Sequence, residues 1–247
     1  MSIDDLVEYK KHGRPFPPNA FTITFDDGFE NNYSIAAPVL EDLKVPAMFY
    51  VTSGFVQHNY MSWIDRIELC LEESGSVQLN LPWHSELVNV NSCEQKIEIL
   101  DEIRLEVKSN ADFPIELLIE GIYYDCGREL VNKSSDPLDQ KMNWKEVTKL
   151  NQHELFRVGG HSHYHSILSF LEKKSLEQEI AFSLRLLKEN AGVEAEHYSY
   201  PEGLAHCYSE DVISELKSHG VYCCPSAIDG IAKLEDDLFH LPRVMAV

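Results

Sequence analysis

The chain is poor in basic residues. Of its 247 residues, 21 are Lys or Arg and 41 are Asp or Glu, which gives a formal net charge of −20. Nucleic acids and anionic membrane surfaces are bound through basic surfaces, so this balance excludes both as the main partner. We interpret the acidity as a solvated surface that aids solubility and assign no specific partner to it.

Long apolar runs and a regular cysteine pattern are also missing. No run approaches the roughly 20 apolar residues of a membrane-spanning helix, and the N-terminus, Met1-Ser-Ile-Asp-Asp-Leu6, is too polar for a signal peptide. The six cysteines have no disulfide-framework spacing, and the adjacent Cys223 and Cys224 form neither a zinc nor a redox motif. We therefore expect a cytoplasmic protein without a transmembrane segment, in which the thiols are reduced and mostly buried.

Strands and helices alternate in the first part of the chain. Phe21–Phe25 has the aromatic and β-branched alternation of a short buried strand, residues 31–43 have one apolar helical face, and residues 47–52 form an apolar strand. A strand, a helix and a strand within about thirty residues are typical of a parallel sheet. With 44% hydrophobic residues, the chain is expected to fold as one α/β domain, residues 1–247.

The alternation is interrupted between about residues 61 and 142. This region has helical patterns at 63–72 and 93–109, a strand-like run at 76–81 and an apolar stretch at 114–124. It is too long for a loop, so we interpret it as a mainly helical insertion. Two roles stay open for it: a surface that shapes the substrate site, or the contact of a homo-oligomer.

The alternation resumes after residue 142. The expected elements are helices at 144–152, 175–190 and 209–218 and strands at 156–159, 197–200, 221–224 and 241–247.

The strand at 21–25 leads into Thr24-Phe-Asp-Asp-Gly28. Adjacent residues at a strand end point in different directions, so Asp26 and Asp27 are free to take different roles, one binding a metal and one moving a proton. The carboxyl ends of strands are where α/β folds place their chemistry. Taken alone, Asp-Asp-Gly is more often a polar turn.

A second polar cluster, Gly160-His-Ser-His-Tyr-His165, follows the strand at 156–159. The i, i+4 spacing of His161 and His165 lets both imidazoles converge, in a helix or in a tight loop. Two neutral imidazoles and a carboxylate suit zinc or another divalent transition metal. A single histidine beside a loop is more often structural, but three within five residues make metal binding an equal interpretation. His163 is expected to point elsewhere.

Three strand-end motifs now stand in order: Thr24-Phe-Asp-Asp-Gly28, His161-Ser-His-Tyr-His165 and Ser199-Tyr-Pro-Glu-Gly203. Together they resemble the polysaccharide deacetylase family, carbohydrate esterase family 4, with its NodB-homology fold. The first two motifs match in full, and the resemblance is weakest across residues 61–142. It implies an α/β fold that is a distorted (β/α) barrel with fewer than eight regular strands.

The resemblance also implies roles for individual residues. Asp26 would be the general base, and Asp27, His161 and His165 would bind the metal, typically zinc, with cobalt or nickel in some members. The backbone N–H of Glu202 would stabilise the oxyanion, and Tyr200, Glu202 and Trp63 would contact the substrate. For Trp63, and for Asp65 beside it, a core residue with a helix cap is the alternative interpretation.

The third motif departs from the family pattern. Glu202 replaces the usual tyrosine, Ser199 stands where an arginine is usual, and the C-terminal Leu-x-His that carries the general acid is not evident. His206, just beyond Gly203, is our candidate general acid, and His240 is a weaker one. Arg243 is a candidate ion-pair partner that would orient Asp26.

These observations predict a metal-dependent hydrolase that removes an acetyl or formyl group from an amino sugar. Without a signal peptide, the expected substrate is a nucleotide- or lipid-linked sugar of surface-polysaccharide biosynthesis, such as O-antigen, lipopolysaccharide or exopolysaccharide. Two alternatives stay open. A catalytically degenerate sugar-binding protein is favoured by Glu202 and the missing acid, and disfavoured by the four intact site residues. A metal-dependent hydrolase of a non-sugar amide is the other.

Overall fold

The computed structural model describes residues 1–111 and 113–246. The chain divides into two compact units, Met1–Asn59 with Lys141–Val247 (unit 1) and Tyr60–Gln140 (unit 2). The buried apolar residues follow the same division: three hydrophobic clusters consist of unit 1 residues and one consists of unit 2 residues. Each unit therefore has a core of its own.

The sheet of unit 1 is parallel. Its strands are β1 (Ile23–Phe25), β2 (Ala47–Val51) and β5 (Phe156–Gly160), in the order β1-β2-β5. All five residues of β2 are buried, because alternate side chains serve both faces: Phe49 and Val51 lie in one hydrophobic cluster, and Met48 and Tyr50 lie in another.

Beyond β5 the parallel pairing continues only as single bridges, Gly160 with Tyr198 and His197 with Cys223. The strands expected at 197–200 and 221–224 are therefore reduced to one pairing each. The strand expected at 241–247 is absent from residues 241–246, where Pro242 has no N–H for a ladder. Val247 lies outside the described residues. Two backbone hydrogen bonds still attach this segment, from Ser226 N to Leu241 O and from Arg243 N to Ile228 O.

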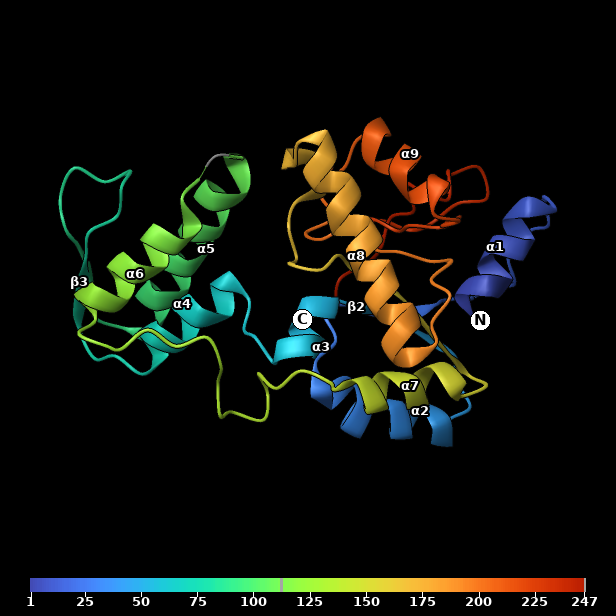
Figure 1. The fold of residues 1–247 in the computed structure, drawn as a ribbon, viewed down its shortest axis with the longest axis horizontal. Coiled ribbons are helices and arrows are strands. Elements are labelled where there is room, and N and C mark those ends of the chain that lie inside the picture. The colour runs from blue at the N-terminus through green and yellow to red at the C-terminus, as the bar shows by residue number, and fades with distance from the viewer. Residues whose placement is uncertain (112, 247) are drawn as a thin grey trace. The chain divides into compact units, whose positions relative to one another are not determined.

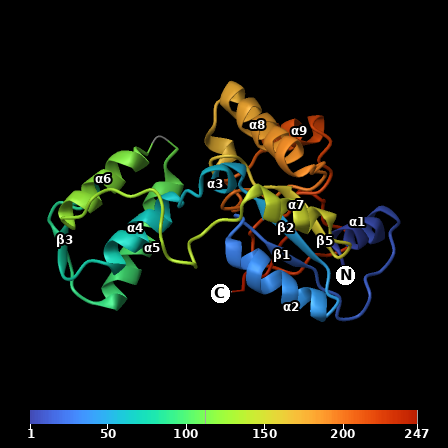
Figure 2. The ribbon, with the colours of Figure 1, turned by 60° about the horizontal axis from the view of Figure 1, so that its bottom comes forward.

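Helices surround the sheet of unit 1, and Figures 1 and 2 show α9 lying beside α8. Helix α3, directly after β2, was not expected from the sequence, and the helix expected at 31–43 begins with a π-helical turn. The helical elements are α1 (Ile3–Lys11), η1 (Asn32–Ala36), α2 (Ala37–Asp42), α3 (Ser53–His58), α7 (Trp144–Gln152), η2 (Leu168–Phe170), α8 (Lys173–Ala191) and α9 (Glu210–Ser218).

Unit 2 combines three helices with a small hairpin. The elements are α4 (Trp63–Glu72), β3 (Val77–Leu79), β4 (Val88–Val90), α5 (Cys93–Ser109) and α6 (Ile115–Asp125). Strands β3 and β4 pair antiparallel; β4 was not expected, since its segment reads as a polar turn. Ile67, Ile103 and Ile119, one from each helix, are fully buried in the core of this unit. The sequence pattern thus located α4 and α5, and the apolar stretch at 114–124 is the third helix, α6.

Two expectations from composition can be compared with the structure. Among the described residues, no helix is sufficiently long and apolar to span a membrane. The six cysteines are free thiols; four of them, including the adjacent Cys223 and Cys224, are buried, whereas Cys93 is exposed.

Candidate metal centre and active site

The turn after β1 presents the two adjacent acids. Asp27 and Gly28 both have left-handed backbones, with φ of 71° and 90°, and Gly28 N donates to Asp26 O at 2.9 Å. Gly28 is closely surrounded, since a Cβ there would lie 3.4 Å from Cγ1 of Val51. The tight reversal turns the side chains of Asp26 and Asp27 toward different partners.

The loop after β5, residues 161–165, carries the three histidines and is called the histidine loop below. It is attached to the end of β2. His161 N donates to Val51 O at 3.1 Å, and Thr52 Oγ1 donates to His161 O at 2.9 Å. Gly54 N donates to His163 O at 3.0 Å, where any Cβ on Gly54 would clash with the same oxygen. The segment is irregular rather than helical, so His161 and His165 converge through a tight loop.

Asp27, His161 and His165 form one cluster. Oδ1 of Asp27 lies 3.4 Å from Nε2 of His161 and 3.2 Å from Nε2 of His165, and the three ligand atoms lie within 4.8 Å of one another. Nδ1 of His161 is 2.8 Å from Ser199 O, so it carries the proton and donates. That hydrogen bond leaves the Nε2 lone pair of His161 facing the cluster, the arrangement of a metal-ligating histidine.

The electrostatics of this cluster fit a bound cation. Oδ1 of Asp27 is buried and accepts no hydrogen bond from the part of the chain that the structure describes. Burial opposes ionisation of Asp27, but His165 and His161 outweigh it and hold the Asp27 pKa well below its usual range. Burial also opposes protonation of His165, yet Asp27 raises the His165 pKa to about 9. Two imidazoles around an ionised carboxylate suit a divalent transition metal.

Asp26 faces a guanidinium instead of the histidine pair. Nη1 of Arg243 donates to Oδ1 of Asp26 at 2.9 Å and Nη2 donates to Oδ2 at 2.8 Å, a two-pronged ion pair. Ser199 Oγ donates to the same Oδ2 at 3.2 Å. Oδ2 also lies 4.0 Å from Nε2 of His161, so the acid borders the cluster without belonging to it. Asp26 is thus held in one orientation at the edge of the cluster of Asp27, His161 and His165.

Arg243 is fixed by further bonds. Its Nε donates to Ser226 O at 2.6 Å, its Nη1 to Thr24 Oγ1 at 3.1 Å and its Nη2 to Ser199 Oγ at 3.0 Å. Burial favours the neutral guanidinium, but Asp26 outweighs this and raises the Arg243 pKa. The C-terminal segment therefore supplies a cation beside Ser199, the position at which the family pattern has its arginine.

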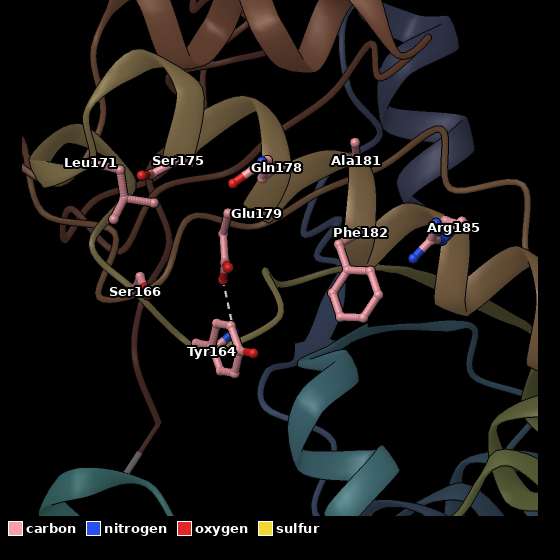
Figure 3. Close-up of a pocket in the computed structure, with 9 residues that line it drawn as sticks. All are labelled: Tyr164, Ser166, Leu171, Ser175, Gln178, Glu179, Ala181, Phe182 and Arg185. Carbon is pink, nitrogen blue, oxygen red and sulfur yellow. Dashed lines mark hydrogen bonds between the residues drawn. The ribbon is translucent and has the colours of Figure 1, made fainter.

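A contact between Glu179 of α8 and the backbone of the histidine loop was not recognised from the sequence. We call this contact the Glu179 clasp. Oε1 of Glu179, buried on α8, accepts from the N–H of His163 at 2.9 Å and from that of Tyr164 at 2.7 Å, the second of which is drawn in Figure 3. Tyr198 OH accepts from Ser162 N at 2.7 Å. Glu179 gave no local signal, because it resembles any polar position of an amphipathic helix.

His163 points away from the candidate metal centre, as expected, and it is buried rather than exposed. Its Nδ1 shares a hydrogen bond of 2.8 Å with Ser53 Oγ, and its ring lies 4.4 Å from that of Phe182. Burial, with a smaller effect of His58, lowers the His163 pKa to about 4, so it is neutral at pH 7. Its role is to pack the loop.

The structure distributes the residues of the third motif differently. The Tyr200 ring lies in the hydrophobic core, 1% exposed, stacked on Tyr208 at 4.1 Å, and its hydroxyl donates to Phe239 O. This leaves only the backbone of Tyr200 for a substrate. Glu202 has a φ of 61° and a charge that acts on His165. His206 is exposed, and its ring lies 6.0 Å from that of Phe170.

Trp63 and Asp65 belong to unit 2. Asp65 closes a capping box at the start of α4: Ser62 N donates to Asp65 Oδ2 at 3.1 Å, and Asp65 N donates to Ser62 Oγ at 3.2 Å. Trp63 is partly buried against the hydrophobic core of its own unit. The structure therefore shows Asp65 as a helix cap, the alternative to a substrate contact. A substrate contact by Trp63 stays a prediction.

Comparison with known proteins gives the family. A family model described as polysaccharide deacetylase matches residues 13–109 and 124–224. The chain belongs to the polysaccharide deacetylase family. A poly-β-1,6-N-acetyl-D-glucosamine N-deacetylase of Staphylococcus aureus (strain MSSA476) is 33% identical over 67 residues, which are 27% of this chain and 23% of that protein. The same enzyme from strain COL matches equally. The matched stretch is thus under a quarter of the length of these relatives.

Solved structures agree on the fold. The BpsB deacetylase domain from Bordetella bronchiseptica superposes with a TM-score of 0.60 at 16% identity, over 99% of this chain and 77% of that one. IcaB from Ammonifex degensii superposes with a TM-score of 0.58 at 17% identity, over 100% and 76%. The Streptococcus pyogenes deacetylase PplD gives 0.60 at 12% identity, over 99% and 72%. The fold is the α/β, distorted (β/α)-barrel type of the NodB-homology proteins, as the motifs predicted.

Proposed function

We propose that this protein is a metal-dependent hydrolase that removes the N-acyl group from amino-sugar units of a surface polysaccharide. Water adds across the amide C–N bond, which yields a carboxylate and a free amine. The observation that carries the proposal is that the two neighbouring acids have different partners. Asp27 faces His161 and His165, whereas Asp26 is held beside them by Arg243.

Asp27, His161 and His165 are the proposed metal ligands. A divalent metal such as zinc supplies, when bound, a Lewis acid for the acyl carbonyl and a lowered pKa for water. The three residues would contribute two imidazole nitrogens, with His165 losing its proton when the metal binds, and one carboxylate oxygen, a set that leaves positions open for substrate and water. The Ser199 carbonyl fixes the ring of His161 through Nδ1. Cobalt and nickel accept the same ligands.

Asp26 is the proposed general base. Its oxygens accept from Arg243 and Ser199, so the carboxylate keeps one orientation at the edge of the ligand cluster while it takes the proton of the attacking water. The backbone N–H of Glu202, at the left-handed turn after Pro201, is the proposed oxyanion donor. His206 is the proposed acid that returns a proton to the leaving amine.

The substrate proposed is a polymer of N-acetylglucosamine. Support comes from the relatives, whose names specify poly-β-1,6-N-acetyl-D-glucosamine as the polymer that they deacetylate. This choice makes acetyl rather than formyl the expected leaving acyl group. It also replaces the nucleotide- or lipid-linked sugar expected from the sequence with a polymeric one as the preferred substrate.

The test is product release from a panel of amides by the zinc-loaded protein. Acetate and free amine should appear with β-1,6-linked N-acetylglucosamine oligomers and to a smaller extent with the monosaccharide. The Asp26→Asn variant should lose a factor of about 10² to 10⁴ in kcat, the range that a positioned general base contributes, while keeping its metal. Faster hydrolysis of simple non-sugar amides, or release from none of these substrates, would contradict the proposal.

A further inference from the structure

A pocket lies beside the histidine loop, between that loop and helix α8. It has a volume of about 640 Å³. Figure 3 shows Glu179 and Phe182 projecting from α8 toward the loop that carries Tyr164. Ligand pockets of small molecules measure about 300 to 1,000 Å³, so this one has the size for a sugar unit. Its walls include Tyr164, Ser166, Ser175, Gln178, Phe182 and Arg185.

The lining combines aromatic faces with neutral polar groups. Tyr164 is 69% exposed, and Phe182 is a second aromatic residue of the lining. The lining also includes the hydroxyls of Ser166 and Ser175 and the amide of Gln178. A pyranose ring presents an apolar C–H face and a rim of hydroxyls, so aromatic faces flanked by hydroxyl and amide groups match both.

The charge of the pocket argues against an anionic ligand. Arg185 is the one cation among the lining residues, and it lies 4.9 Å from the centre of the Phe182 ring. The one anion is Glu179, whose Oε1 is occupied by the N–H groups of His163 and Tyr164. The chain as a whole carries a net charge of −20. Phosphates and nucleotides would need more positive charge, whereas a neutral sugar does not.

The pocket is joined to the candidate metal centre by covalent structure. Tyr164 of its wall is the chain neighbour of His165 of the candidate ligand cluster. The same two N–H bonds to Glu179 fix both the wall and the loop. One loop therefore carries both a candidate metal ligand and a wall of the pocket.

We propose that the pocket between the histidine loop and α8 is a second saccharide subsite, which binds an N-acetylglucosamine unit of the same polymer away from the reacting one. This inference rests on the proposed function for the identity of the polymer. The subsite makes the enzyme prefer oligomers to monosaccharides, because the binding free energy of the remote unit adds to that of the reacting unit.

Binding is tested on full-length Asp26→Asn protein loaded with zinc, so that the ligand is not consumed. The ligand is the β-1,6-linked N-acetylglucosamine tetramer, titrated by calorimetry. Adding Gln178→Ala, and separately Phe182→Leu, which keeps apolar bulk against His163, should each weaken binding by about five- to tenfold, the loss typical of an important contact. The matched control is Glu177→Ala, an exposed neighbour on α8 outside the lining, which should not change the affinity.

Hydrolysis gives a second readout. In the active protein, the ratio of kcat/KM for the tetramer to that for the monosaccharide should fall by about the same factor in Gln178→Ala, whereas mere loss of folded protein lowers both values equally. If the tetramer binds through Gln178 and Phe182 but is not deacetylated, the proposed function fails and the subsite stands. Equal tetramer affinity in all variants, or no tetramer binding at all, would overturn the subsite.

Discussion

Four residues around the candidate metal centre have left-handed backbones. Asp27, Ser162, His165 and Glu202 have φ values between 57° and 71°. Residues other than glycine pay roughly 1–2 kcal/mol for this region, so the surrounding structure has to hold them there. The hydrogen bond from Thr52 N to Asp27 O does so at Asp27. Backbone strain at two proposed metal ligands, Asp27 and His165, is typical of a functional site.

Arg243 is expected to act as a positioning residue. Arg243→Lys keeps the charge but loses the two-pronged contact with Asp26, so kcat should fall by about 10- to 100-fold while KM and metal content change little. The measurements are steady-state kinetics with the acetylated oligomer and elemental analysis of the purified variant. Arg157→Lys, at the exposed pair with Asp4, is the control. An unchanged kcat in Arg243→Lys would show that Asp26 does not need this partner.

Substitution by alanine is expected to change stability in opposite directions at two glycines. In Gly54→Ala, the new Cβ would lie 2.4 Å from His163 O, so about 1–3 kcal/mol of stability should be lost and the histidine loop displaced. Gly121 lies inside α6 with nothing within 4 Å of a Cβ, so Gly121→Ala should stabilise by about 0.5–1 kcal/mol. Denaturant unfolding measures both. Equal effects would contradict the steric account.

At the scale of elements, α8 supports the candidate site through Glu179, which accepts two hydrogen bonds from the histidine loop. Glu179→Ala would leave the N–H groups of His163 and Tyr164 without their acceptor. We expect a loss of about 2–4 kcal/mol in stability and about tenfold or more in zinc affinity. Glu179→Gln, which retains an acceptor oxygen, should lose less in both.

Thermal unfolding and competition titration with a zinc chelator measure these two quantities, and Glu177→Ala on the same helix serves as the control. If Glu179→Ala were destabilised but bound zinc with unchanged affinity, the residue would support only the fold. The ligand-orienting role of the clasp would then be wrong.

Helix α1 is attached to the sheet by Asp4. Oδ1 of Asp4 lies 2.9 Å from Nε2 of His197, and Oδ2 accepts from Nε of Arg157 at 2.9 Å. The hydrogen bond with His197 is the largest influence and, with Arg157, lowers the Asp4 pKa against the effect of burial. A lowered pKa means that this stabilisation is present above the unfolded value near 3.8 and is lost as the pH falls further.

Asp4→Asn should therefore destabilise the protein by about 1 kcal/mol at pH 7, a modest value because the pair is partly exposed. For a chain of this length that is about 2–4 °C in Tm. As the pH falls below 3.8, the difference in Tm between the variant and the wild type should shrink. Calorimetry at several pH values tests this, with Glu189→Gln as the control. A Tm difference that does not shrink in acid would contradict the ionic attachment of α1.

For the whole molecule, the sequence located the acids and histidines of the candidate site because they follow strands. Parallel pairing of β1, β2 and β5 brings their carboxyl ends to one edge of the sheet. The positions of Asp27, His161 and His165 after these strands were therefore enough to predict that they cluster. The helices at 63–72, 93–109 and 144–152 were equally readable, since their apolar periodicity is strong.

What could not be predicted depends on long-range packing. The Glu179 clasp joins residues fifteen or sixteen positions apart, and no local pattern marks it. Tyr200 was expected to contact the substrate, but its ring lies in the core, where its hydroxyl donates to Phe239 O. The strands at 197–200 and 221–224 have apolar patterns but pair through single bridges. Sequence periodicity reports burial better than it reports ladder length.

The measurement that tests the central claim most directly is the metal content of the purified full-length protein by elemental analysis. The comparison is between wild type, His161→Ala/His165→Ala and a control, His12→Ala/His219→Ala, which alters two exposed histidines elsewhere. We predict about one equivalent of a divalent transition metal in the wild type and the control, and none in the double ligand variant. No metal in the wild type after loading with zinc or cobalt, or full retention by the ligand variant, would contradict the account.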